Sequence, residues 1–200
     1  MTRPARGRPR SFDAERALDA ALDVFWRHGY EGTSMSALTA AMGINTPSLY
    51  AAFGDKQSLF MKAVERYVER PASYLAVACR EPTARRVAER LFAGAIEMVS
   101  RPKNPDGCLL VQAALATAPD ASPVRTELAR LRRAAEAHVR RRLEGALADG
   151  DLPQGTDAAQ LARYLITVLW GLSVQSATGA TRKELEETAR VAVQAVPASP

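Results

Sequence analysis

The sequence predicts an all-α protein in which a small N-terminal unit of three short helices precedes a larger helical unit. Apolar residues recur at helical spacing along most of the chain, and no segment alternates between apolar and polar residues as a strand would. Capping residues such as Ser, Thr and Asp stand before the apolar stretches, and Gly or Pro follows them. With 47% hydrophobic and 24% charged residues, the 200-residue chain has the composition of a folded protein.

Caps and stops delimit the three short helices, which we expect at residues 13–28, 33–42 and 45–53. Gly29 and Gly43 end the first two, because glycine readily adopts the left-handed conformation in which helices often stop. Pro47 stands in the first turn of the third helix, where its missing N–H costs nothing. A unit of this size buries only a marginal core, so it is expected to lean on the larger unit.

The larger unit is expected to contain six helices, at 56–69, 83–100, 108–117, 123–149, 157–178 and 181–196. Pro71 follows the first of these as a kink or stop. Ser122 and Thr156 are the expected caps of the fourth and fifth helices, and Thr181 with Glu184 forms a capping box at the start of the last. No internal repeat is present, which argues against a solenoid.

Several classes of protein are excluded by composition. No apolar run approaches the ~18 residues of a membrane span, and no apolar segment follows the basic N-terminus as in a signal peptide. Two cysteines are too few for a disulfide framework. We therefore expect a cytoplasmic protein without membrane contact.

The segment 33–53 has the pattern of a helix-turn-helix. Gly43 can reverse the chain between the two short helices, and apolar residues on one face of each helix can hold their crossing. Thr46, Ser48 and Tyr50 are left on the exposed side of the second helix. Because an α-helix fits the DNA major groove and its N-terminal residues reach the base edges, this pattern favours DNA binding.

Over residues 12–62 the sequence resembles the DNA-binding signature of the tetracycline-repressor (TetR) family. The resemblance lies in Gly29–Met35, Ile44–Tyr50, Phe53 and Lys56–Leu59. One departure is Ala52, where relatives often carry His or an aromatic residue. The family implies an N-terminal helix-turn-helix DNA-binding domain, here residues 1–55 with a basic arm, and a C-terminal effector-binding and dimerisation domain at 56–200.

The resemblance implies a role for each residue of the signature. Thr46 and Ser48 would lie in the major groove, and Thr33, Tyr50 and Lys56 would contact phosphates. Three alternatives remain: Tyr50 is a packed aromatic residue, Ser48 is a surface hydroxyl, or Thr33 is simply a helix cap.

Two basic clusters account for much of the net charge of +5. Arg6, Arg8 and Arg10 lie in a segment that resembles an AT-hook core, in which arginines enter a narrow A·T minor groove. The alternative is a disordered tail that attracts DNA without specificity. The second cluster, in 130–142, is interleaved with Glu and is expected to be a solvated helix face with intrahelical ion pairs.

The family resemblance further implies a small-molecule cavity and a homodimer formed by the last two long helices. Residues 161–174 are apolar nearly all round, and Gly171 and Ser173 would let a partner helix approach closely. The few charges favour a largely apolar effector. Candidate lining residues, for which core packing is the alternative, are Phe92, Met98, Cys108, Leu110, Tyr164 and Trp170.

Cys108 is also a candidate sensor of electrophiles. At a helix start its thiol pKa would be lowered, whereas Cys79 in an apolar run would be inert. The alternative is that Cys108 is a small buried residue.

Together these features predict a repressor that leaves a palindromic operator when a small ligand binds, with no cofactor and no metal. Double-stranded operator DNA, the effector and a second copy of the chain are its expected partners. An architectural DNA-binding protein without an effector, or a helical enzyme or carrier, are the alternatives. The sequence contains no nucleophile elbow or phosphate loop, and Cys79, Cys108 and His138 match no metal-ligand spacing.

Overall fold

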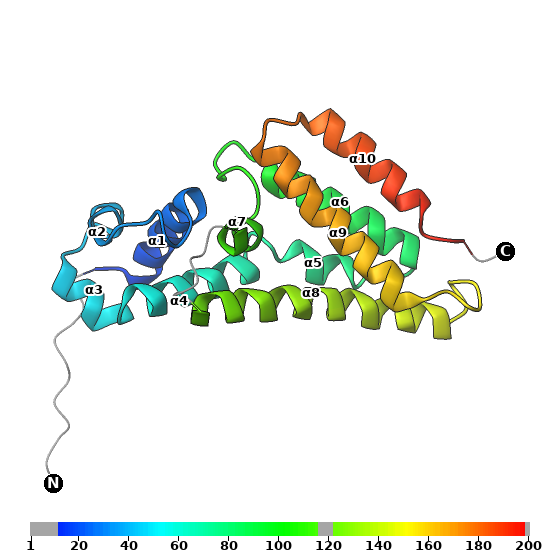
Figure 1. Cartoon of the computed structure of the whole chain (residues 1–200), viewed down its shortest axis with the longest axis horizontal. Helices are drawn as coiled ribbons and strands as arrows, with labels where there is room; N and C mark the ends of the chain where they lie inside the picture. Colours follow the sequence, from blue (N-terminus) through cyan, green and yellow to red (C-terminus); the bar gives the residue numbers. More distant parts are fainter. Residues whose placement is uncertain (1–11, 116–121, 199–200) are drawn as a thin grey trace, which may run out of the picture.

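The computed structural model describes residues 12–115 and 122–198, and this part of the chain is helical without strands (Figure 1). The all-α prediction is therefore confirmed. Arg6, Arg8 and Arg10 lie outside the described residues. The helices are α1 (Ala14–His28), α2 (Met35–Met42), α3 (Thr46–Phe53), α4 (Lys56–Glu69), α5 (Tyr74–Ala78), α6 (Ala84–Val99), α7 (Leu109–Leu115), α8 (Ser122–Ala148), α9 (Ala158–Ala177) and α10 (Arg182–Gln194).

The helices form a small head and a larger body (Figure 1). The head consists of α1, α2 and α3, and α4 leads from it along the same edge of the molecule that α8 continues. The helices α6, α9 and α10 lie together at the other end, and α7 lies between head and body. This arrangement leaves α2 and α3 at one extremity of the molecule.

Most of the predicted helix ends agree with the structure. The side chain of Asp13 accepts hydrogen bonds at the start of α1, and Thr181 and Glu184 form the predicted capping box. The expected cap at Thr156 is wrong. Asp157 caps α9 instead, because its carboxylate reaches the N–H of Gln160 at 2.9 Å while the Thr156 hydroxyl donates to Pro153 in the preceding loop.

Two short elements differ from the prediction. The sequence did not predict α5, which is only five residues long and starts without a side-chain cap, so neither periodicity nor a cap marks it. The helix expected at 108–117 begins one residue later, at Leu109. Its predicted end at 117 lies outside the described part of the chain.

The head shares its hydrophobic core with the body through α1 and α4. Phe25 packs edge-on against Phe60 with ring centroids 5.0 Å apart, and Trp26 packs in the same way against Tyr67 at 4.8 Å. Arg66 on α4 is only 6% exposed and pairs with acidic groups of α1. The core is continuous from α1 to α10, so the head does not fold around a centre of its own.

Gly94 and Gly145 give a matched pair of substitutions within helices. A Cβ at Gly94 would lie 2.5 Å from the Cβ of Tyr74, which cannot swing away, whereas a Cβ at Gly145 would meet nothing within 4 Å. We expect Gly94→Ala to lower the free energy of unfolding by about 1–3 kcal/mol, because α5 has to shift. Gly145→Ala should raise it by up to about 1 kcal/mol, because alanine loses less backbone entropy. Urea denaturation measures both, and equal effects would contradict the close packing of α5 on α6.

Candidate nucleic-acid interface and regulatory core

The turn between α2 and α3 has the geometry of a helix-turn-helix. Gly43 is left-handed, with φ 66° and ψ 31°, and its N–H donates to the carbonyl of Ala40 at 3.3 Å. Leu38 and Leu49, one from each helix, are fully buried and hold the crossing. The polar face of α3 is thereby turned away from the core.

That face carries the groups predicted to read DNA. Asn45 caps α3 by accepting a hydrogen bond from the N–H of Ser48 at 2.9 Å. Thr46 is exposed and Ser48 half-buried. Tyr50 is 51% exposed, which speaks against the alternative that it is a packed core residue.

Thr33 lies differently from the other predicted contacts. Its side chain is 1% exposed and its hydroxyl donates to the carbonyl of Gly29 at 2.6 Å, so it holds the turn that precedes α2. The exposed hydroxyls at this end belong to Ser34 and Ser36, whose oxygens are 2.9 Å apart. The sequence analysis overlooked this pair, although two serines at a helix start are a visible signal.

Lys56 is fixed near the end of α3. Its ammonium nitrogen lies 4.6 Å from the ring centroid of Tyr30, a cation–π contact that orients the side chain. Asp55 caps α4 by accepting from the N–H of Ser58 at 2.7 Å, and this hydrogen bond lowers the pKa of the Asp55 carboxyl. The junction of α3 and α4 therefore presents an oriented cation beside the polar face of α3.

A second polar cluster joins the head to the body. The Trp26 indole N–H donates to the carbonyl of Gly107 at 3.2 Å, in the segment just before α7. The hydroxyl of Tyr67 donates to the Sγ of Cys108 at 3.1 Å and lies 3.4 Å from the Sδ of Met98. We call Trp26, Tyr67, Met98, Gly107 and Cys108 the junction. Sequence analysis missed Trp26, Tyr67 and Gly107, because residues so far apart in the chain meet only on folding.

The predicted activation of Cys108 is wrong. Cys108 is buried, and burial raises its thiol pKa although the hydrogen bond from Tyr67 opposes this. Cys79 is half-buried, and burial raises its pKa too, against the opposing charges of Arg142 and Arg141. Position at a helix start does not compensate for desolvation here, and Cys79 is the more accessible thiol.

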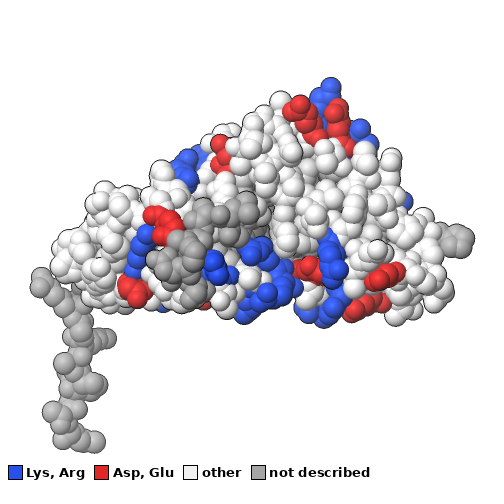
Figure 2. Space-filling model, in the orientation of Figure 1, with Lys and Arg blue, Asp and Glu red and all other residues white. Residues whose placement is uncertain are grey.

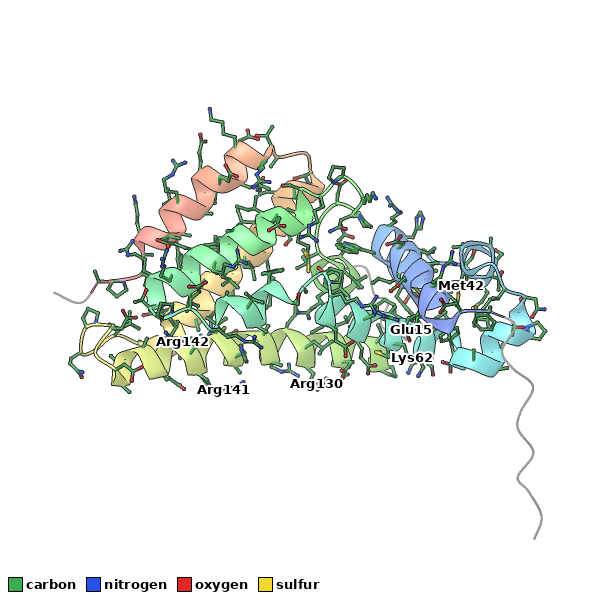
Figure 3. All side chains as sticks on the ribbon, turned by 180° about the vertical axis from the view of Figure 1, so that it is seen from behind. Glu15, Met42, Lys62, Arg130, Arg141 and Arg142 are labelled. Atoms are coloured by element: carbon green, nitrogen blue, oxygen red, sulfur yellow. The ribbon has the colours of Figure 1, made fainter. Side chains whose placement is uncertain are left out.

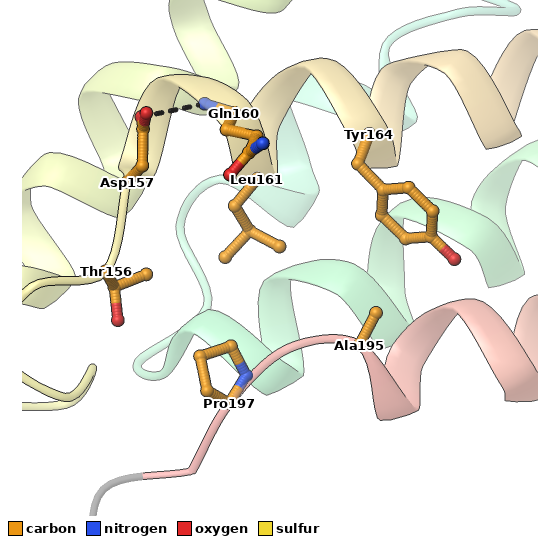
Figure 4. A pocket seen from close by; sticks show the side chains of 7 residues that line it. All are labelled: Thr156, Asp157, Gln160, Leu161, Tyr164, Ala195 and Pro197. Atoms are coloured by element: carbon orange, nitrogen blue, oxygen red, sulfur yellow. Dashed lines mark hydrogen bonds between the residues drawn. The ribbon is translucent and has the colours of Figure 1, made fainter.

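The grooves lined by described residues do not bring the six candidate ligand residues together. Phe92 is buried, and Leu110 and Trp170 are partly buried in the core. Tyr164 is 40% exposed in a groove of about 420 Å³ between the start of α9 and the chain after α10 (Figure 4). Met98 contributes instead to a groove of about 270 Å³ beside α5, and with Cys108 it belongs to the junction.

The basic cluster on α8 only partly matches the expected solvated face with intrahelical ion pairs, because some of its arginines bind other segments. Lys and Arg gather over α8 in Figure 2, and the view from behind shows Arg130, Arg141 and Arg142 along this helix (Figure 3). Arg130 pairs with Glu127 within the helix. Arg142 donates to the backbone carbonyls of Glu81 and Pro82, so it secures the segment before α6.

Neither a metal site nor a membrane-spanning helix occurs within residues 12–115 and 122–198. No three His, Cys, Asp or Glu side chains in this part are grouped as ligands for a metal ion. None of its helices is long and apolar enough to cross a membrane.

An all-helical chain with this helix-turn-helix at one extremity belongs to the DNA-binding transcriptional regulators. Comparison with known families specifies the class further. The family described as bacterial regulatory proteins, tetR family, matches residues 17–63, and the tetracyclin repressor-like C-terminal domain matches residues 84–192. The chain belongs to the TetR family.

Individual relatives agree with this assignment. A cysteine mutant of the TetR family transcriptional regulator CifR, solved with 26-bp double-strand operator DNA, is 42% identical with a TM-score of 0.90, covering 95% of this chain and 100% of that one. The HTH-type transcriptional repressor ComR of Escherichia coli (strain K12) is 31% identical over 187 residues, 92% of this chain and 89% of ComR. The repressor BdcR of the same organism is 40% identical over 102 residues, 51% of each chain.

The burial of the two cysteines predicts the order in which they react. With iodoacetamide at pH 8, we expect Cys79 to be alkylated at least about tenfold faster than Cys108, because only Cys79 is partly accessible in the folded protein. Peptide mass spectrometry over a time course measures both rates. In denaturant the two should react alike. Faster labelling of Cys108 in the native protein would contradict its burial beneath Tyr67.

Proposed function

We propose that this protein is a homodimeric repressor that binds a palindromic operator through α3 and releases it when a small molecule binds the body. The observation that carries the proposal is the polar face of α3, fixed by a buried apolar face and capped by Asn45. The operator complex of CifR and the name of ComR as a repressor support it. Such a protein acts on the chromosome, which places it in the cytoplasm.

In this proposal the head divides its contacts between bases and backbone. Thr46 and Ser48, in the first turn of α3, read base edges in the major groove. Tyr50 and Lys56 lie on the phosphates, and the buried Thr33 supports this surface from within by holding the turn before α2. The arginines of the N-terminal arm follow the adjacent minor groove. Residues 1–55 form the DNA-binding part, and 56–200 bind the effector and the partner subunit.

The exposed face of α9 is the surface we assign to the dimer. No charged residue occurs between Arg163 and Arg182, and this stretch exposes Tyr164 and Val174 by 40% and 42%. Gly171 lies on the same helix, exposed and with nothing within 4 Å of its Cβ position, so a partner helix can come close. Ser173, the other predicted contact, is buried within the protomer and donates to Leu169.

The junction supplies a route from the body to the head. Trp26 belongs to α1, and it contacts Tyr67 of α4 and Gly107 of the segment before α7. A Cβ on Gly107 would meet the carbonyl oxygen of Ser173 at 3.2 Å, so this segment also packs against α9. Displacing the segment therefore alters the support of α1 and of the dimer helix together. An effector acts by binding the displaced arrangement more tightly.

Substitutions in α3 and at the start of α4 distinguish residues that contact bases from residues that contact phosphates. We expect Ser48→Ala and Thr46→Ala each to weaken operator binding about tenfold while leaving binding to random DNA nearly unchanged. Lys56→Ala should weaken both and reduce the salt slope by about one unit, because one phosphate contact is lost. Fluorescence anisotropy at several salt concentrations measures these effects. Lys103→Ala, on the exposed segment after α6, is the matched control and should change neither. A change of base preference in Lys56→Ala with an unaltered slope would reverse the assignment.

The dimer surface predicts a specific loss of association. Gly171→Leu should weaken dimerisation by more than about tenfold, because the side chain holds the partner helix away. Analytical ultracentrifugation measures the dimer constant, and footprinting should show two half-sites separated by whole turns of ~34–36 Å. Gly145→Leu, on the charged face of α8, serves as the control. A monomeric wild-type protein that fully protects a single half-site would contradict the dimer and the operator.

A further inference from the structure

A groove of about 270 Å³ lies between the end of α4, α5 and α6. Its volume is just below the ~300–1,000 Å³ of sites for drug-sized molecules, so it suits a molecule with a single ring or a short branched chain. The side chains that decide its chemistry are Arg70, Tyr74, Val77, Arg90, Met98 and Arg101.

The rim of the groove is positively charged. It carries three arginines and one acidic residue, Glu97, which accepts a hydrogen bond from Arg101 at 2.6 Å. Hydrogen bonding and charge from Arg101, with a further contribution from Arg90, lower the pKa of Glu97, so this carboxylate remains ionised. Arg90 forms no ion pair with any residue that the structure describes. The rim therefore has cationic groups in excess of its own acid.

Tyr74, Val77 and Met98 supply the apolar part of the groove floor. The Tyr74 side chain packs directly on the backbone of α6 at Gly94, where a Cβ would come within 2.5 Å of it. Met98 is 3% exposed and Val77 is 41% exposed. Through Met98 the floor touches the hydroxyl of Tyr67, a member of the junction. A molecule that contacts Met98 in the groove would thus be separated from Trp26 of α1 only by Tyr67, which contacts both residues.

We propose that this groove is an effector site for a small organic carboxylate, with its carboxylate on the arginine rim and its apolar body against Tyr74 and Val77. Guanidinium groups suit carboxylates because their planar N–H donors match both oxygens. The apolar floor selects against inorganic anions, which gain nothing from it. This inference rests on the proposed function, because it names the class of its effector.

Arg70 connects the site to the head. In the structure its guanidinium lies 3.3 Å from Asp19 and 3.8 Å from Glu15, both on α1, and its side chain is 55% exposed. A bound carboxylate competes with these acids for Arg70. Arg66, buried beside it, keeps its own pair with Glu15. Binding therefore loosens α1 without abolishing its packing on α4.

The size of this effect is limited by the exposure of Arg70. Exposed ion pairs are weak, so the exchange is expected to change operator affinity by up to about fivefold. Thermodynamic linkage requires that operator DNA weaken carboxylate binding by the same factor.

The chemical class is tested by calorimetry on the full-length wild-type protein without DNA. The probes are benzoate, phenylacetate and isovalerate, each beside its uncharged primary amide. We expect at least one carboxylate to bind, and its amide to bind at least about tenfold more weakly. Arg90→Gln should weaken the carboxylate by a similar factor. Arg133→Gln, an exposed arginine on α8 outside the groove, should leave it unchanged. No binding by any probe at millimolar concentration, or equal binding of acid and amide, would overturn the proposal.

The link to the head is tested by titrating the binding carboxylate into a complex with operator DNA. Operator affinity should fall by up to about fivefold in the wild type. In Arg70→Gln, operator affinity should be lower without the carboxylate and should change little when the carboxylate is added. If the carboxylate lowers operator affinity equally in the wild type and in Arg70→Gln, the Arg70 exchange is refuted. Failure to bind any palindromic DNA without a ligand would instead refute the proposed function, while carboxylate binding in calorimetry would stand independently.

Discussion

The packing of α1 against α4 is the interaction on which the rest of this structure depends. Three short helices cannot bury enough apolar surface to be stable on their own, and here Phe25 and Trp26 lie against Phe60 and Tyr67 of α4. The orientation of α3 is therefore set by a helix that also belongs to the body. Anything that changes the support of α1 changes where α3 points.

The polar groups at this contact favour a few defined positions of α1 over a continuous range of positions. The Trp26 N–H and the Tyr67 hydroxyl are buried and have specific partners, Gly107 and Cys108. A small displacement would leave a buried donor without its acceptor, which costs about 1–3 kcal/mol, so intermediate positions are disfavoured. Packed contacts of this kind switch between a few arrangements instead of deforming gradually. Under the proposed function, the same chemistry that stabilises the junction equips it to transmit effector binding from the body to the head.

The arginines of α8 and the arginines beside α5 differ in the partners that they bind. Two arginines of α8 act within the protein, since Arg130 pairs with Glu127 and Arg142 binds backbone carbonyls. Beside α5 the arginines exceed the acids, and one of them, Arg70, is shared with α1. Composition alone does not distinguish these cases, because both surfaces are rich in arginine. The partners that folding brings to each guanidinium decide between structure and binding.

The sequence by itself determined the helical class, most helix ends, the helix-turn-helix and the family, because all of these rest on local spacing and capping. Gly43 and Asn45 act as the sequence indicated. Only the tertiary structure decided the burial, pKa and packing of groups whose neighbours are distant in the chain. Cys108 stands at a helix start, yet the burial that Tyr67 and the core impose raises its pKa. The candidate ligand residues differ widely in burial, from Phe92 in the core to the exposed Tyr164, and α5 packs where Tyr74 fits against Gly94, twenty residues away in the chain. Local propensity operates within a few residues, whereas burial and hydrogen-bond partners are properties of the folded chain.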